Sequence, residues 1–188
     1  MTPLYQIGNN EFTLFHGDSL ELIGHIGKKV DMIFADPPYF LSKRGIKQIN
    51  GTWKSFDKGE WDRVTTHNKI NEFNKTWLSA CRNILKEDGT IFVTGTYHNI
   101  FSVATCMVEL GYKILNIIVW QKSDAKPTLS RSYFSFTTEY IVWARKNEKV
   151  THFGSPDKVR GGLPKIPTRL EGLSFKFTTF AIWNLKQT

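Results

Sequence analysis

The chain contains little cysteine, with only Cys81 and Cys106 among its 188 residues. Both fall in segments with a helical apolar pattern, so we expect small buried residues in a reducing compartment rather than a disulfide or a metal site. The five histidines show no ligand spacing, and no apolar stretch is long enough to span a bilayer. The amino terminus lacks the pattern of a signal peptide. These absences predict a cytoplasmic protein with no metal site and no membrane partner.

Acidic residues are also fewer than basic residues. The sequence carries 25 lysines and arginines against 17 aspartates and glutamates, a formal net charge of +8. Such an excess favours an anionic partner, nucleic acid first, although a basic surface that meets only water is the alternative. The apolar fraction of 40% is ordinary, and 188 residues are enough for one domain with a real core.

An acidic residue, two prolines and an aromatic residue, Asp36-Pro37-Pro38-Tyr39, directly follow the apolar run 30–35. The run is typical of a buried strand, and the prolines end it because proline cannot donate to a sheet ladder. Open α/β sheets place their ligand crevices at the carboxyl ends of such strands. We therefore expect these residues to form a ligand site.

The motif suits a flat heterocycle that bears an amino group. Asp36 and the Pro37 carbonyl can accept the two amino hydrogens, while Tyr39, with Phe40 beside it, stacks on the ring. Accepting both hydrogens draws the nitrogen of an adenine amine towards tetrahedral geometry and frees its lone pair to attack an activated methyl group. An adenine in a duplex must first be flipped out. The alternative is a structural turn capped by Asp36.

Apolar periodicity predicts an α/β fold. The expected strands are 12–16, 30–35 and 90–95, the expected helices are 18–26, 70–85 and 98–110, and two β-rich runs follow at 112–120 and 137–144. Alternation of strands and helices favours a parallel sheet, and the two adjacent final strands favour an antiparallel hairpin at one edge. Gly89 is the expected C-cap of the second helix.

The run 34–42, which contains the Asp36-Pro37-Pro38-Tyr39 motif, resembles the catalytic motif of amino-directed DNA methyltransferases. Further segments resemble the β-group adenine-N6 enzymes that modify GATC or GANTC sites in restriction–modification systems: 57–62, 89–93, 120–122, 138–139 and 143–144. The resemblance implies a Rossmann-like methyltransferase sheet, mostly parallel with a reversed edge hairpin, S-adenosylmethionine as methyl donor and double-stranded DNA as substrate. It also implies that Asp36, Pro37 and Tyr39 hold the target adenine, with Pro38 and Phe40 beside it.

The connection 40–65 has no regular period and mixes basic with aromatic residues. A loop of that length inside a compact domain is usually functional or mobile. We expect Lys43 and Arg44 to follow the DNA backbone and Trp53 or Phe56 to fill the space left by a flipped base. The alternative is that Phe56 and Trp61 are core residues that anchor the loop.

Two weaker candidates lie elsewhere. Lys126 and Arg131, in the polar segment 121–135, are a second candidate DNA contact, with a solvated connection as the alternative. Asp18 follows the first expected strand, where an acid reaches the adenine or ribose part of the cofactor in dinucleotide folds, and a helix N-cap is the alternative. Asp18 and Asp36 are therefore the residues expected at S-adenosylmethionine.

The resemblance ends near residue 149, which divides the chain into an expected catalytic portion, 1–149, and a basic tail with glycines and prolines, 150–188. The glycine-rich loop that holds S-adenosylmethionine in the family has no counterpart here. We therefore expect a sheet truncated before its cofactor-binding strands, with an unpaired edge beside the strand 30–35. Such a chain would pair with itself, as a homodimer, or with a chain that supplies the missing cofactor-binding half.

Three functions stay open at this point. The first is site-specific DNA (adenine-N6) methyl transfer. The second is a remnant or subunit that binds DNA or a partner chain and transfers no methyl group alone. The third, a minor alternative, keeps the enzyme but makes cytosine N4 or RNA the acceptor.

Overall fold

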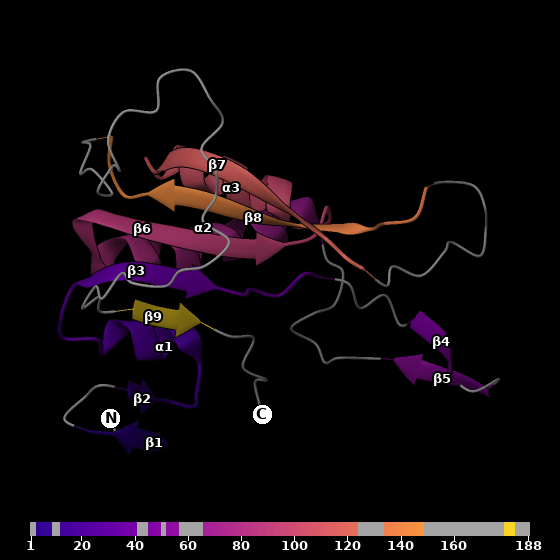
Figure 1. Ribbon diagram of the computed structural model, residues 1–188, viewed down its shortest axis with the longest axis horizontal. Helices are drawn as coiled ribbons and strands as arrows, with labels where there is room; N and C mark the ends of the chain where they lie inside the picture. Colours follow the sequence, from indigo (N-terminus) through magenta and orange to yellow (C-terminus); the bar gives the residue numbers. More distant parts are fainter. Residues whose placement is uncertain are drawn as a thin grey trace.

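The structure is a computed structural model (Figure 1) that describes residues 3–8, 12–40, 45–49, 52–56, 66–123, 134–148 and 179–182. For residues 45–49, 52–56 and 179–182 it describes the backbone alone. Within these ranges no helix is long and apolar enough to cross a membrane.

A five-stranded mixed sheet forms the centre of the fold, in the order β7-β8-β6-β3-β9. Three neighbouring strands run parallel: β6 (Leu85–Gly95), β3 (Val30–Ala35) and β9 (Thr179–Ile182). The hairpin of β7 (Lys113–Gln121) and β8 (Thr138–Arg145) adds two antiparallel strands at one edge. This arrangement confirms the predicted α/β class with a reversed hairpin at the edge.

The described helices are α1 (Ser19–Gly24), α2 (His67–Ile84) and α3 (Ile100–Glu109). Figure 1 shows α2 and α3 together against one face of the sheet. Buried side chains recur along α2 at three- and four-residue steps, as its apolar pattern predicts. Cys81 and Cys106 lie buried in α2 and α3 as free thiols, which confirms their predicted helical and buried positions.

The predicted helix end at Gly89 is wrong. The helix α2 ends at Ile84, and Leu85 is extended and already belongs to β6. Gly89 instead lies inside β6, where an added Cβ would meet Leu85 Cδ2 and the Lys86 carbonyl oxygen at 3.0 Å. Gly89 is therefore a position of close approach within β6 and has no role at the helix end.

The first expected strand does not belong to the main sheet. Phe12–Leu14 forms β2, which pairs with β1 (Tyr5–Ile7) in a separate antiparallel hairpin. The expected alternation of strands and helices therefore begins at β3, with α1 as the short helix that precedes it.

A second small hairpin corrects the prediction for the connection 40–65. There β4 (Gly45–Ile49) and β5 (Thr52–Phe56) pair antiparallel, where the sequence pattern indicated no regular structure. Ile49 pairs with Thr52, and the dipeptide Asn50-Gly51 between them in the sequence is a common hairpin signal. Figure 1 shows the hairpin on the side towards which the arrows of β3 and β6 point.

The edge beside β3 is paired, contrary to expectation. The strand β9 runs parallel to β3 along Met32–Ala35. Because a parallel neighbour engages the main-chain N–H and C=O groups of β3, the unpaired edge predicted beside that strand is absent. The strand β9 lies within 175–183, the one stretch of the segment 150–188 in which the sequence pattern indicates an element.

The core lies between the sheet and the helices. Alternate residues of β3 and β6 face it: Ile33 pairs with Ile91 and Ala35 with Val93, and all four are at most 1% exposed. Because side chains alternate along a strand, the residues between them point to the opposite face of the sheet. The pairing register therefore decides which polar side chains meet where the two strands end.

Replacing Ile91 by alanine is expected to lower the free energy of unfolding by about 2–5 kcal/mol, because removing a fully buried side chain leaves a cavity. Ile117→Ala is the matched control, since Ile117 is 50% exposed on the edge strand β7. This control is expected to cost less than about 1 kcal/mol. Urea denaturation followed by circular dichroism measures both values, and equal losses would contradict the placement of the core.

Candidate active site

The loop that leaves β3 is anchored by an aromatic side chain. Residues 36–39 follow the last strand residue, and the two prolines cannot donate to a ladder. Phe40 then adopts a left-handed conformation with φ 56°, which is uncommon for residues other than glycine. Its ring is 6% exposed and meets the edge of Phe73 on α2, with 5.7 Å between the ring centroids. Phe40 thus fastens the loop to α2, and its predicted contact with a base stays a prediction.

Two hydroxyl groups bind one oxygen of the Asp36 carboxylate. The Tyr39 hydroxyl donates to Asp36 Oδ1 at 2.8 Å, and the Thr94 hydroxyl donates to the same atom at 2.5 Å. The two hydroxyl oxygens are 3.1 Å apart. The second carboxylate oxygen, Oδ2, has no hydrogen bond to another described residue. The protein therefore holds one oxygen of the carboxylate and leaves an acceptor for a ligand.

The register between β3 and β6 accounts for the contact between Asp36 and Thr94. Ala35 pairs with Val93, so the next residue on each strand lies on the face away from the helices. Both strands end here, which places a carboxylate and a hydroxyl side by side at the carboxyl end of the sheet. The contact is thus a consequence of main-chain pairing.

A second tie reaches the main chain of the loop. Asn99 Nδ2 donates to the Pro38 carbonyl at 3.2 Å, and Asn99 Oδ1 accepts from the Thr96 amide at 3.1 Å. Asn99 is fully buried, and Gly95 makes room for it, since a Cβ there would lie 2.6 Å from Asn99 Oδ1. The Pro38 carbonyl is therefore occupied, whereas the Pro37 carbonyl has no hydrogen bond to another described residue.

The hydroxyl of Tyr39 keeps its proton and so remains a hydrogen-bond donor. Burial raises the pKa of Tyr39 well above its ordinary value; the hydrogen bond with Thr94 lowers it in part, and the charge of Asp36 raises it again. Glu139 makes a smaller contribution in the same upward direction. The hydroxyl therefore stays protonated at neutral pH and continues to donate to Asp36.

The site is partly open to the outside. Asp36, Pro38 and Tyr39 are half-buried, whereas Pro37 and Phe40 are buried. Part of the surface of Asp36 and Tyr39 is therefore accessible from outside.

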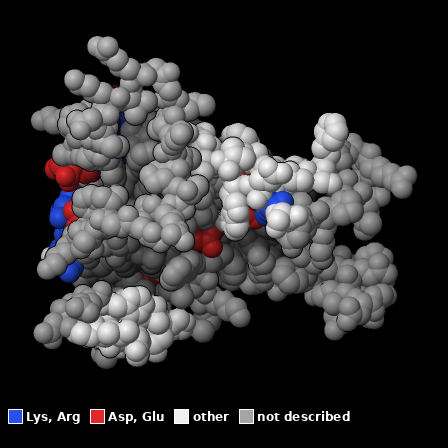
Figure 2. Space-filling model, viewed as in Figure 1, with Lys and Arg blue, Asp and Glu red and all other residues white. Residues whose placement is uncertain are grey.

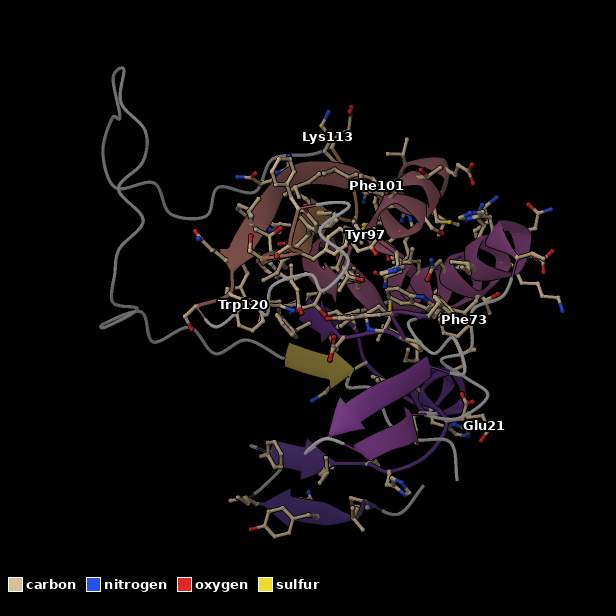
Figure 3. The ribbon with its side chains drawn as sticks, turned by 90° about the vertical axis from the view of Figure 1, so that its right-hand side faces the viewer. Glu21, Phe73, Tyr97, Phe101, Lys113 and Trp120 are labelled. Atoms are coloured by element: carbon tan, nitrogen blue, oxygen red, sulfur yellow. The ribbon has the colours of Figure 1, made fainter. Side chains whose placement is uncertain are left out.

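Exposed aromatic side chains surround this end of the sheet. Figure 3 looks at the end where β3 and β6 finish and labels Tyr97, in the turn after β6, and Trp120, near the end of β7. Tyr97 stacks on Phe136 with 4.1 Å between the ring centroids, and the two are 38% and 52% exposed. Trp120 is 58% exposed. Lys122 and Glu139, from segments that resemble the family, form an ion pair at the same end of the β7–β8 hairpin.

Asp18 caps a helix. Its Oδ1 accepts from the main-chain amides of Leu20 and Glu21 at 2.7 and 3.4 Å, at the start of α1. This contact confirms the N-cap alternative. A role of Asp18 at a cofactor stays a prediction.

The residues predicted to contact DNA lie largely outside the described part of the chain. Lys43, Arg44, Lys126 and Arg131 fall outside it, and Trp53 lies on β5, whose side chains are not described. Their contacts with DNA stay predictions.

Basic and acidic side chains balance in the part of the chain whose side chains are described. Ten lysines and arginines and ten aspartates and glutamates fall there, so the other fifteen basic and seven acidic residues account for the net charge of +8. Figure 2 shows charges of both signs close together at the left end of the visible face. The basic excess belongs to the segments 41–65, 124–133 and 149–188.

The sequence prediction did not include Thr94 or Asn99. Thr94 lies near the end of the run 90–95 as Asp36 follows the run 30–35, so two polar residues at neighbouring strand ends were a usable signal. Nothing in the local sequence marks Asn99, because its contact with Pro38 depends on tertiary structure. Within the described ranges, no group of three or more His, Cys, Asp or Glu side chains is arranged to hold a metal ion.

Comparison with known proteins gives a family. The family model described as DNA methylase (N6/N4 methyltransferase) matches residues 30–187. The chain is 40% identical over 159 residues to the Type II methyltransferase M2.MboI of Moraxella bovis, covering 84% of this chain and 58% of the relative. It is 44% identical over 148 residues to M2.DpnII of Streptococcus pneumoniae, covering 78% and 54%. The chain thus spans about half the length of the curated relatives that it matches.

Solved structures share the fold. A crystal structure of the M1.HpyAVI–SAM complex is similar with a TM-score of 0.51 at 21% identity, over 77% of this chain and 61% of that one. The PvuII DNA methyltransferase, described as cytosine-N4-specific, is similar with a TM-score of 0.56 at 18% identity, over 78% and 52%. These likenesses confirm the Rossmann-like methyltransferase sheet.

Stability is expected to fall at alkaline pH. Burial raises the pKa of Tyr39 and of Tyr112 above the ordinary value of 10.0, and the Tyr112 hydroxyl also donates to the Leu78 carbonyl at 2.9 Å. Above about pH 10 the unfolded chain releases these protons while the folded chain keeps them, so the stabilisation present below that pH is lost as the pH rises. The loss is up to about 1.4 kcal/mol per pH unit for each hydroxyl.

Urea denaturation between about pH 8 and pH 11 measures this slope. Tyr39→Phe and Tyr112→Phe are each expected to flatten it. Tyr5→Phe, at a position that is 55% exposed, is the control and is expected to leave it unchanged. Identical slopes in all four proteins would contradict the protonated state assigned to the buried hydroxyls.

Proposed function

The chain belongs to the DNA methylase family, and we propose that it carries the base-binding site of a site-specific DNA (adenine-N6)-methyltransferase. One observation carries the proposal: the Asp36 carboxylate stands at the end of β3 with Oδ1 held by two hydroxyls and Oδ2 left as an acceptor. A carboxylate oxygen in that state suits one hydrogen of an amino group. Similarity to Type II methyltransferases supports the same assignment.

The chemistry follows from the two acceptors. Asp36 Oδ2 accepts one hydrogen of the adenine amino group, and the Pro37 carbonyl accepts the other. The nitrogen lone pair is then less delocalised into the ring, and the acceptors stabilise the positive charge that develops on nitrogen as it attacks the methyl carbon. The Tyr39 ring, fixed by its hydroxyl bond to Asp36, offers a face on which the adenine stacks.

The residues present fit the methyl donor that the family implies. When bound, S-adenosylmethionine supplies a methyl group on a positively charged sulfur. Asp36 carries a carboxylate oxygen with no cation bound to it among the described residues, and a negative charge there favours a positive group close by. We assign Asp36 to this neighbourhood, with Asp18 as a weaker candidate because its carboxylate already caps α1.

We propose that the partner is double-stranded DNA and that the protein acts in the cytoplasm. The basic excess of the segments 41–65, 124–133 and 149–188 suits a phosphate backbone. The exposed rings of Tyr97, Phe136 and Trp120 at the end of the sheet are side chains on which nucleobases stack. The free thiols of Cys81 and Cys106 are consistent with a reducing compartment.

A second candidate is a subunit that binds DNA but receives its cofactor-binding half from a second copy or from another chain. The span of about half the length of the curated relatives is the observation that favours testing it. Cytosine N4 or RNA as acceptor is a minor alternative, because the first residue of the motif is aspartate, which resembles the adenine type more often.

The decisive test is tritium transfer from S-adenosylmethionine to duplexes that contain GATC or GANTC. The wild-type chain is expected to incorporate label, and Asp36→Ala is expected to lower the rate at least about 100-fold, because the main acceptor of the amino group is lost. The affinity for DNA is expected to change less than about threefold, since phosphate contacts dominate it.

Asp31→Ala is the matched control, since Asp31 lies on the same strand and pairs with Lys86 at 2.8 Å, away from the loop. It is expected to keep the rate. Retained transfer in Asp36→Ala would remove the role assigned to that residue. Incorporation by the wild type only after a cofactor-binding half is supplied would favour the subunit.

Replacing Lys43, Arg44 and Lys47 together by alanine is expected to flatten the salt dependence of DNA binding. Each lost phosphate contact reduces the slope of log K against log salt concentration by about 0.9. The triple control Lys28→Ala, Lys29→Ala and Lys113→Ala removes the same charge from the opposite end of the strands. Fluorescence anisotropy measures both slopes, and an unchanged slope in the first variant would show that the segment does not touch phosphate.

A further inference from the structure

We infer that Thr94 is a positioning residue: its hydroxyl fixes the Asp36 carboxylate so that Oδ2 faces the amino group. The inference rests on the proposed function, because fixing Oδ2 matters for the reaction only if this oxygen accepts a hydrogen of the adenine amino group. It concerns a residue outside the Asp36-Pro37-Pro38-Tyr39 motif, on the neighbouring strand β6, which β4, β5 and α2 separate from the motif in the sequence.

The hydroxyl of Thr94 has one hydrogen and two acceptors within reach. The distance from its oxygen to Asp36 Oδ1 is 2.5 Å, whereas the distance to the Ala35 carbonyl is 3.4 Å. A charged acceptor at the shorter distance gives the stronger hydrogen bond, so the hydrogen points to the carboxylate. The Thr94 oxygen lies 3.1 Å from the Tyr39 hydroxyl, whose single hydrogen goes to Asp36 Oδ1.

The two donors to Oδ1 differ in how firmly they are held. Tyr39 belongs to the loop itself, so its bond moves with the loop. Thr94 belongs to β6, which is paired on one side with β3 and on the other with β8, where Thr94 faces Ile141. Its β-branched side chain is stiff about χ1. Thr94 therefore ties the carboxylate to the centre of the sheet.

Holding Asp36 Oδ1 in place also determines where Oδ2 of the same carboxylate points. A carboxylate with one bound oxygen can still turn about its Cβ–Cγ bond, and two donors from different elements restrict that rotation. A displacement of about 1 Å in a reacting group can lower a rate about 100-fold. Loss of the Thr94 hydroxyl is therefore expected to affect the chemical step more than the binding of DNA.

A second threonine on the same face of β6 provides a matched comparison. The Thr90 hydroxyl donates to the Ala144 carbonyl at 2.8 Å and accepts from Trp143 Nε1 at 2.7 Å. It is as firmly bonded as Thr94 but lies at the other end of the ladder, four residues from the site. Its hydroxyl stabilises the sheet and touches nothing in the loop.

The experiment compares Thr94→Val, Thr94→Ser and Thr90→Val in the tritium-transfer assay, with urea denaturation of each protein. Thr94→Val is expected to lower kcat about 10- to 100-fold while KM for DNA changes less than about threefold, because the lost bond acts on the transition state. Thr94→Ser keeps the hydroxyl and is expected to retain kcat within about threefold. Thr90→Val is expected to lower the urea midpoint and to keep kcat.

An unchanged kcat in Thr94→Val would overturn the inference. So would an equal loss in Thr94→Ser, because the hydroxyl would then not be the group that matters. If Thr90→Val lowered kcat as much as Thr94→Val, general destabilisation of the sheet would explain the loss, and the inference would be overturned.

A spectroscopic readout separates this inference from the proposed function. The ¹³Cγ chemical shift of Asp36 at neutral pH reports the hydrogen bonds of its carboxylate and is expected to change in Thr94→Val but not in Thr94→Ser. If the wild-type chain transfers no methyl group, the proposed function fails and the shift still decides whether Thr94 holds the carboxylate. An identical shift in all three proteins would overturn the contact itself.

Discussion

The parallel register between β3 and β6 is the constraint on which the site depends. It pairs Ala35 with Val93 and so brings the next residues, Asp36 and Thr94, together on the face away from the helices. A slip of one residue would exchange the two faces of a strand, burying a polar side chain and exposing an apolar one. Core packing resists that slip, so the same apolar contacts that stabilise the sheet also hold the carboxylate in place.

The loop after β3 is held against its own conformational preference. The left-handed backbone of Phe40 costs about 1–3 kcal/mol for a residue with a side chain. Burial of its ring against Phe73 and the bond from Asn99 to the Pro38 carbonyl offset that cost from two different helical regions. The main-chain acceptors and the carboxylate are therefore arranged before any ligand arrives, which lowers the reorganisation needed during a reaction.

The sequence predicts the elements with strong local signals and misses those that depend on distant partners. The bounds 30–35 follow from an apolar run ended by prolines and agree with β3. The apolar period over 70–85 predicts the second helix, which spans His67–Ile84 and ends before the predicted cap at Gly89. The apolar stretch 175–183 indicates an element where β9 lies, but its pairing with β3, far away in the sequence, depends on tertiary structure and is not predicted. Within the site, Asp36 and Tyr39 carry a motif, whereas Asn99 contributes through a tertiary contact alone.

The excess of basic residues and the Asp36 site lie in different parts of the sequence. The part of the chain whose side chains are described, which contains the core and the Asp36 carboxylate, has equal numbers of basic and acidic residues and therefore no net charge to oppose folding. The basic excess falls in the segments 41–65, 124–133 and 149–188. The carboxylate is held by its own neighbours, Tyr39 and Thr94, while the basic excess, which favours affinity for a polyanion, lies in other segments of the sequence.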